Sequence, residues 1–167
     1  MLRCTIGVED DVKVPVHHLA HFDVACSPAA VFDLVADVPR SVSHFPGVAA
    51  LVPLGDNAFR WEMEPINLMK FTHRIVYACR YVADPGTLGV MWTPVAGVGN
   101  SVIHGHWRLG PSTKLSGGAA IEFESCGELD VPVPALLRKV AAPVVEHQYR
   151  SMVDAYHANL RKTLEAA

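Results

Sequence analysis

Charged residues are scarce in this chain. They make up 19% of its 167 residues, against roughly 25% in an average globular protein. Lys and Arg never form a block longer than two residues, and the net charge is -3. Because a nucleic-acid surface needs a concentrated basic patch, nucleic acid is not expected as a partner. Half of the residues are hydrophobic, which is enough apolar surface for one folded domain over residues 1–167.

Long hydrophobic runs are also missing. The longest ones, at 48–54 and 140–145, are far shorter than the ~18 residues of a membrane span, so no transmembrane segment is expected. The polar N-terminus lacks the apolar core of a signal peptide, and residues 1–13 are expected to be loosely ordered. The cysteines contain no C-x-x-C pair, which excludes a zinc knuckle and a thioredoxin-type centre. Together these features predict a cytoplasmic protein with reduced thiols. The cysteines are Cys4, Cys26, Cys79 and Cys126.

Familiar catalytic signatures do not occur in the sequence. It has no P-loop and no G-x-S-x-G, and Val102 stands where a G-x-G-x-x-G fingerprint would need its third glycine. The carboxylate pairs Glu62/Glu64 and Glu122/Glu124 alternate with apolar residues, which places them on the outer face of strands. That position does not favour the paired acid–base chemistry of a glycosidase.

The first part of the chain predicts a strand followed by two short helices. Residues 14–26 are rich in Val, Phe and His, as strands are. Ser27 then suits a helix N-cap and Pro28 the first helical position, and apolar residues follow at helical spacing. A second short helix is predicted from about Arg40 to the stop signal at residues 46–47.

Further strands are predicted between turn signals rich in Gly, Pro, Asp and Asn. Residues 93–100 contain Pro and Gly and are predicted to be a loop. Sequential hairpins indicate an antiparallel sheet, with about seven strands when the first is counted. The six later strands are 48–54, 58–66, 70–82, 87–92, 101–109 and 119–131.

The C-terminal part predicts a long amphipathic helix. An apolar stripe at spacings of three and four runs through it. Pro143 is expected to break this helix, giving a short turn to about Ala142 and a long helix over 143–164. The chain is therefore predicted to be α+β, with helices on one side of a curved antiparallel sheet. The stripe comprises Leu137, Ala141, Val145, Tyr149, Met152, Tyr156 and Leu160.

Strand alternation decides the place of the histidine pair in "SVIHGHWRL". His104 and His106 share a face with Arg108, opposite the apolar residues, and so belong to a solvated ladder of cross-strand pairs. Glu122 or Glu124 could add one metal ligand, but such carboxylates are common on any wet sheet. The group His17, His18 and His21 lacks the helical H-E-x-x-H form. We therefore expect no metal and no cofactor.

The inner face carries the more informative polar groups. His73, Tyr77 and Tyr81 alternate with polar residues and fall on the apolar face. A buried imidazole or phenol needs a hydrogen-bond partner. The three groups could bond one another or the backbone, they could lie near the rim of the sheet, or they could line a cavity and orient a ligand. Gly105, also on this face, would permit the close approach of another group.

The segment 27–54 and the order of elements resemble the START-like (SRPBCC) superfamily, which includes polyketide cyclases, plant pollen-allergen-type proteins and quinone-binding proteins. The shared pattern is Ser/Ala-Pro-x-x-Val-Phe/Trp-x-x-Val/Leu-x-Asp, followed by a short helix that ends near Pro-Gly. The likeness in plan spans residues 14–164. It implies a helix-grip fold, in which the sheet wraps the C-terminal helix around a deep apolar cavity. The matching residues are Ser27, Pro28, Val31, Phe32, Val35, Asp37, Phe45, Pro46 and Gly47.

Three functions follow as hypotheses, because one fold hosts many activities. The preferred one, implied by the resemblance, is binding or transport of a small hydrophobic ligand such as a lipid, sterol, quinone or polyketide. The second is a polyketide cyclase or dehydratase with His73 as general base and Tyr77 or Tyr81 as proton donor. The third is an accessory protein that docks on a larger complex or forms a homodimer. The predicted ligand-binding residues are Trp61, Met63, Phe71, His73, Tyr77, Ile103, Trp107, Phe123, Gln148 and Met152.

Overall fold

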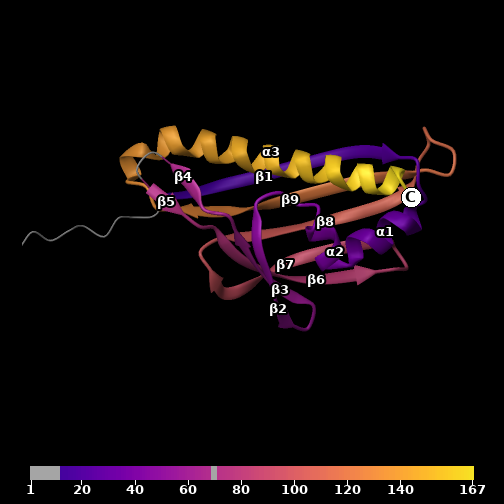
Figure 1. The fold of residues 1–167 in the computed structure, drawn as a ribbon, viewed down its shortest axis with the longest axis horizontal. Helices are drawn as coiled ribbons and strands as arrows, with labels where there is room; N and C mark the ends of the chain where they lie inside the picture. The colour runs from indigo at the N-terminus through magenta and orange to yellow at the C-terminus, as the bar shows by residue number, and fades with distance from the viewer. Residues whose placement is uncertain (1–11, 69–70) are drawn as a thin grey trace, which may run out of the picture.

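The computed structural model describes residues 12–68 and 71–167. It is an α+β fold in which one curved sheet carries two short helices and one long helix (Figure 1). None of the helices in these two ranges is long and apolar enough to cross a membrane. In chain order the elements are β1 (Val12–Val24), α1 (Pro28–Ala36), α2 (Val38–Val42), β2 (Val48–Gly55), β3 (Ala58–Met63), β4 (Ile66–Leu68), β5 (Phe71–His73), β6 (Val76–Asp84), β7 (Gly89–Gly99), β8 (Val102–Pro111), β9 (Ala119–Val131), the single 3₁₀ turn η1 (Ala135–Leu137) and α3 (Arg138–Glu165).

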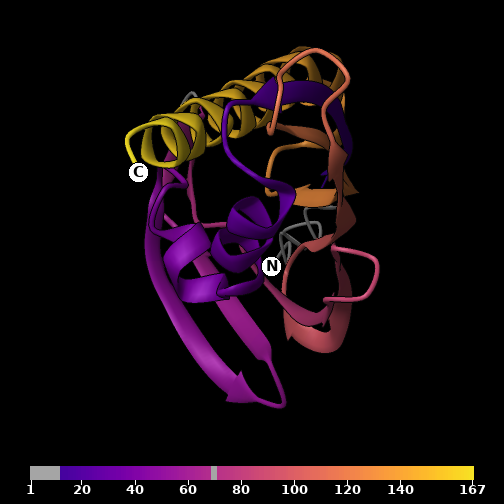
Figure 2. The same ribbon diagram turned by 90° about the vertical axis from the view of Figure 1, so that its right-hand side faces the viewer.

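The main sheet has seven antiparallel strands in the order β1-β9-β8-β7-β6-β3-β2. A separate pair, β4 and β5, forms a small second sheet. The helix α3 runs along β1 (Figure 1), and the sheet curls around α1 and α2 (Figure 2). This arrangement is the predicted helix-grip, with the core between the concave face of the sheet and the helices.

The two short helices begin where the sequence places capping residues. The Ser27 hydroxyl accepts a hydrogen bond from the Ala30 amide at 3.2 Å, and the Asp37 carboxylate accepts one from the Arg40 amide at 3.2 Å. Both bonds satisfy amides that the first turn of a helix leaves without a partner. The second helix therefore starts at Val38, slightly before the predicted start.

The strand predicted over 70–82 is two strands. It is interrupted at residues 74–75, so that β5 pairs with β4 and β6 joins the main sheet. The prediction of a loop over residues 93–100 is wrong, because β7 continues to Gly99. Tyr77 pairs with Gly99 whereas Cys79 pairs with Pro94, so the strand bulges between them. A bulge accommodates the Pro and Gly residues that the sequence indicated as turn formers.

The helix break predicted at Pro143 is also wrong. Pro143 lies inside α3, which is continuous from Arg138 to Glu165. A proline at this position removes only the hydrogen bond to the Lys139 carbonyl. The buried stripe beyond it, including Val145 and Tyr149, supplies packing that holds the helix together across that missing bond.

Candidate functional site

A cavity of about 50 Å³ lies between the concave face of the sheet and the three helices. It is lined by 17 residues, mostly aromatic or β-branched. All three tryptophans and all four tyrosines of the chain are among them. The lining residues are Val35, Val38, Ser41, Val42, Phe45, Trp61, Tyr77, Tyr81, Val90, Trp92, Ile103, Trp107, Phe123, Ser125, Tyr149, Val153 and Tyr156.

Strand alternation brings the sheet side of the lining together. Residues two apart along a strand point to the same face, so Tyr77 and Tyr81 of β6, Ile103 and Trp107 of β8, and Phe123 of β9 all face the helices. From the opposite side, α1 and α2 supply Val35, Val38, Ser41 and Val42, and α3 supplies Tyr149, Val153 and Tyr156.

The aromatic rings of the lining contact one another. Trp61 and Tyr77 are stacked, with ring centroids 5.5 Å apart and an angle of 19° between the planes. Trp107 lies 4.6 Å from Phe123, and Phe45 lies 5.0 Å from Tyr156. Contacts of this kind stabilise a packed wall beyond the area that they bury. The cavity is therefore bounded by aromatic rings that pack against one another.

Side-chain hydrogen bonds that involve tyrosine hydroxyl groups hold several of these side chains in place. The Trp61 Nε1 donates to the Tyr81 hydroxyl at 3.0 Å. The Tyr149 hydroxyl donates to the Ser125 Oγ at 2.6 Å, which ties α3 to β9.

A second hydroxyl pair, Ser41 and Tyr156 at 2.5 Å, ties α2 to α3. Tyr77 differs from the other tyrosines: among the described residues, its hydroxyl makes no hydrogen bond, although the residue lines the cavity. It is therefore available to a ligand.

The cavity wall carries no charge. Asp, Glu, Lys, Arg and His are all absent from the lining residues of the described chain. Burial raises the pKa of Tyr77 and of Tyr81 well above the ordinary phenol value, and it raises the pKa of Tyr149 to about 12. These phenols stay protonated at neutral pH. Protonated phenols cannot act as bases, and the Tyr77 hydroxyl can donate a hydrogen bond to a ligand.

The structure brings five of the ten sequence-predicted ligand residues to this cavity. Trp61, Tyr77, Ile103, Trp107 and Phe123 line it, as does Tyr81, the alternative proton donor. Met63, His73, Gln148 and Met152 do not line it.

Met63 is buried in the core without reaching the cavity, and Met152 packs against the core near Gly47. Gln148 is exposed on α3, because Tyr149, its neighbour on the helix, takes the inward direction. The side chain of Phe71 lies outside the described part of the structure.

His73 does not line the cavity. Its Nε2 lies 2.8 Å from the backbone carbonyl oxygen of Asp130. The same Nε2 lies 3.3 Å from the Asn100 side-chain amide nitrogen, so two groups outside the cavity lining contact it. The interruption at residues 74–75 separates its short strand, β5, from β6, and the general-base role of His73 stays a prediction.

Sequence reasoning missed four large lining residues: Phe45, Trp92, Tyr149 and Tyr156. Tyr149 and Tyr156 belong to the predicted apolar stripe of the last helix, but they were expected only to pack there. Trp92 pairs directly with Gly105 across β7 and β8. A Cβ at Gly105 would lie 2.4 Å from the Trp92 ring, so the glycine permits the close approach that its position suggested. In the sequence, the feature that indicated a close neighbour at this position was Gly105.

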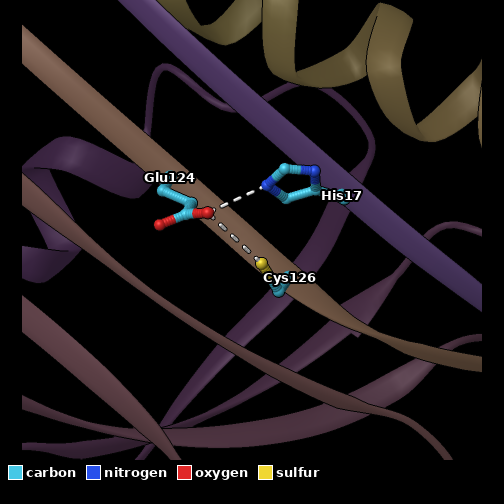
Figure 3. A group of neighbouring side chains, drawn as sticks. All are labelled: His17, Glu124 and Cys126. Atoms are coloured by element: carbon cyan, nitrogen blue, oxygen red, sulfur yellow. Dashed lines mark hydrogen bonds and ion pairs between the residues drawn. The ribbon is translucent and has the colours of Figure 1, made fainter.

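The outer face holds the histidine ladder that the sequence predicted. His106 lies 3.0 Å from Glu122, and Arg108 lies 2.8 Å from the same carboxylate. On the neighbouring strand, His17 contacts Glu124 at 2.9 Å, with the Cys126 sulfur 3.9 Å from Glu124 (Figure 3). Hydrogen bonding to His106 lowers the pKa of Glu122, and hydrogen bonding to His17 lowers that of Glu124.

Comparison with known proteins identifies the fold. No protein-family model matches the sequence, and no curated protein matches it. A START superfamily protein from Mycobacterium smegmatis is similar in structure with a TM-score of 0.62 and 13% identity, over 90% of this chain and 97% of that chain.

Two enzymes of known structure are also similar. An aromatase/cyclase from Streptomyces gives a TM-score of 0.58 and 12% identity, over 91% of this chain and 92% of that chain. The norcoclaurine synthase of Thalictrum flavum gives a TM-score of 0.52 and 16% identity, over 92% of this chain and 98% of that chain. At these identities the likeness shows a START-like fold.

Proposed function

We propose that this protein binds a small, flat, uncharged molecule in the aromatic cavity. The observation that carries the proposal is the wholly uncharged lining, which includes one tyrosine hydroxyl, that of Tyr77, available for a ligand. A charged ligand would lose its hydration there without gaining a counter-charge, which is strongly unfavourable. A carbonyl oxygen on an otherwise apolar ring system would match the Tyr77 donor.

The dimensions of the cavity restrict the ligand further. Ligand pockets commonly measure about 300–1,000 Å³, whereas this cavity measures about 50 Å³. A flat ligand that separates the aromatic walls needs the smallest side-chain movement. Burial of ~200 Å² of apolar ligand surface contributes about 5 kcal/mol before the cost of association.

Binding without catalysis is the form of the proposal that the cavity supports. General acid–base catalysis needs a group that titrates near neutral pH within reach of the substrate. The described cavity wall contains no such group, and the His73 Nε2 lies 2.8 Å from a backbone carbonyl outside the cavity lining. The solved aromatase/cyclase and norcoclaurine synthase share the fold, but a fold does not determine chemistry.

The test is a titration of the full chain with menadione, a flat quinone, and with naphthalene, which has no carbonyl group. Because every tryptophan lines the cavity, binding will change the tryptophan fluorescence. We expect Tyr77→Phe to weaken menadione binding about fivefold, the value of one hydrogen bond, and to leave naphthalene binding unchanged.

The matched control is Met91→Ala, because Met91 is exposed on β7 next to Trp92. It should bind both compounds like the unmodified chain. Native mass spectrometry of protein purified without detergent adds an independent measurement. Absence of binding by both compounds, together with a mass spectrum of bare protein only, would contradict the proposal.

One observation favours docking on another protein as a second candidate. Leu136, Val140 and Val144 follow one another at intervals of four and are 90%, 62% and 41% exposed, respectively. An apolar stripe of this kind at the start of a helix is typical of a contact surface. If it joins two copies of the chain, sedimentation will show a dimer that Val140→Glu dissociates without altering menadione binding. A monomer at all concentrations would exclude the homodimer.

A further inference from the structure

Three metal-binding side chains from β1 and α3 meet on the inner side of the sheet. They are His18 of β1, and Asp154 and His157 of α3. One ligand atom of each lies within 4.8 Å of the other two. The His18 Nε2 lies 3.2 Å from the Asp154 Oδ1, about the separation of two ligands on one tetrahedral ion with bonds of ~2.0–2.1 Å.

His157 is an unusual member of the hydrophobic core. It is 8% exposed, and its ring lies 4.5 Å from that of Phe123, 5.2 Å from that of Phe22 and 5.5 Å from that of Trp107. Within the described residues, its Nε2 atom has no hydrogen-bond partner. Buried polar atoms almost always have a partner, so a lone imidazole nitrogen here indicates a group that the protein chain itself does not supply.

We propose that His18, Asp154 and His157 form a binding site for a divalent transition-metal ion of the zinc type. Two imidazole nitrogens and one carboxylate oxygen are a ligand set that Zn²⁺ accepts, with a further position open to water. Imidazole ligands favour such ions over Ca²⁺ and Mg²⁺, which prefer oxygen.

The surroundings provide an entry path and one opposing charge. The Asp154 side chain is 66% exposed, so it can turn toward an ion arriving from solvent. The positive charge of Arg150 acts on His18 and opposes a cation, whereas the carboxylate of Asp154 favours it. Binding of the ion therefore depends on the Asp154 carboxylate, and loss of that carboxylate should weaken binding strongly.

An outer cluster of His17, Glu124 and Cys126 offers one imidazole, one carboxylate and one thiol (Figure 3). There, however, the His17 side chain is 58% exposed and already bonded to Glu124. No atom of that cluster is among the buried atoms without a partner. The outer cluster is thus explained by its own hydrogen bonds, and it serves as an internal control.

The experiment uses the full chain after treatment with a chelator. Zn²⁺ is titrated in competition with a chromophoric chelator, and Co²⁺ is added to a second sample to give visible absorption from its bound form. We expect one equivalent of each ion per chain. Asp154→Asn should weaken Zn²⁺ binding at least tenfold, and His157→Phe should abolish it, whereas Glu124→Gln should leave it unchanged.

Each variant has a defined purpose. Asp154→Asn changes an exposed side chain and keeps its shape, so it tests the site without a risk to folding. His157→Phe keeps an aromatic ring among the neighbouring rings. The proposal is overturned if less than one equivalent binds, if both inner variants bind Zn²⁺ like the unmodified chain, or if Glu124→Gln removes binding. Because menadione binding is measured separately, failure here leaves the proposed function unaffected.

Discussion

The Trp92 ring occupies the space that a side chain at Gly105 would need. The two residues face each other across β7 and β8, and a Cβ on Gly105 would lie 2.4 Å from the indole and 2.1 Å from the Glu124 carbonyl oxygen. This absence of a side chain lets Trp92 reach the cavity, where it lies 5.7 Å from Phe123. One glycine thereby shapes a wall of the site.

Gly105→Ala should accordingly destabilise the protein. The added methyl group meets a backbone atom that cannot move freely, and overpacking of this kind costs about 1–3 kcal/mol. Urea unfolding followed by circular dichroism measures the change. Gly110→Ala on the same strand is the matched control, because a Cβ there meets nothing within 4 Å; equal stability of both variants would contradict the explanation.

The hydrogen bond between Tyr149 and Ser125 should contribute measurably to stability. Tyr149→Phe leaves the Ser125 hydroxyl, itself 3% exposed, without its partner at 2.6 Å, which costs about 1–3 kcal/mol. The double variant with Ser125→Ala should lose less than the sum of the two single losses. Denaturation of all four proteins gives the coupling energy, and strict additivity would show that the two hydroxyl groups do not interact.

The buried phenols should make the protein sensitive to alkali. In the folded protein, burial raises the pKa of Tyr77 and of Tyr81 well above the ordinary phenol value, and it raises the pKa of Tyr149 to about 12. In the unfolded chain, the pKa of a tyrosine is about 10. Above about pH 10 the folded state then holds more protons than the unfolded state, so stability falls by about 1.4 kcal/mol per pH unit for each phenol. Below that pH the stabilisation is complete.

Urea unfolding at several alkaline pH values checks this slope, and phenolate absorbance reports ionisation directly. Tyr77→Phe should make the slope shallower by the contribution of one proton. If phenolate absorbance of these tyrosines appears near pH 10 while the circular dichroism is still that of the folded protein, the assignment of these groups as buried and neutral is wrong.

The outer ladder should contribute much less than the cavity contacts. Glu122 contacts His106 at 3.0 Å and Arg108 at 2.8 Å, but the Arg108 side chain is 69% exposed. Pairs of this kind contribute about 0–1 kcal/mol and weaken with salt. Glu122→Gln should therefore reduce the free energy of unfolding by less than about 1 kcal/mol at low salt, and by less still at high salt. A loss as large as that of Tyr149→Phe would show that the ladder holds the sheet together.

The sequence by itself determined the α+β plan, the start of the first helix at Ser27, and the two faces of the strands. These features depend on local patterns: capping residues satisfy amides a few positions away, and side chains alternate along a strand. For that reason His104 and His106 were correctly placed on the polar face, and Trp61, Tyr77 and Trp107 on the inner one.

Only the tertiary structure decided which inner residues line the cavity and which merely pack. His73 shares the inward alternation of Tyr77, but its Nε2 bonds to the Asp130 carbonyl, a partner from the far end of β9. His18 and His157 come from opposite ends of the chain and meet because α3 lies along β1. Such meetings depend on how strands and helices pack over long distances in sequence, which a local pattern does not encode.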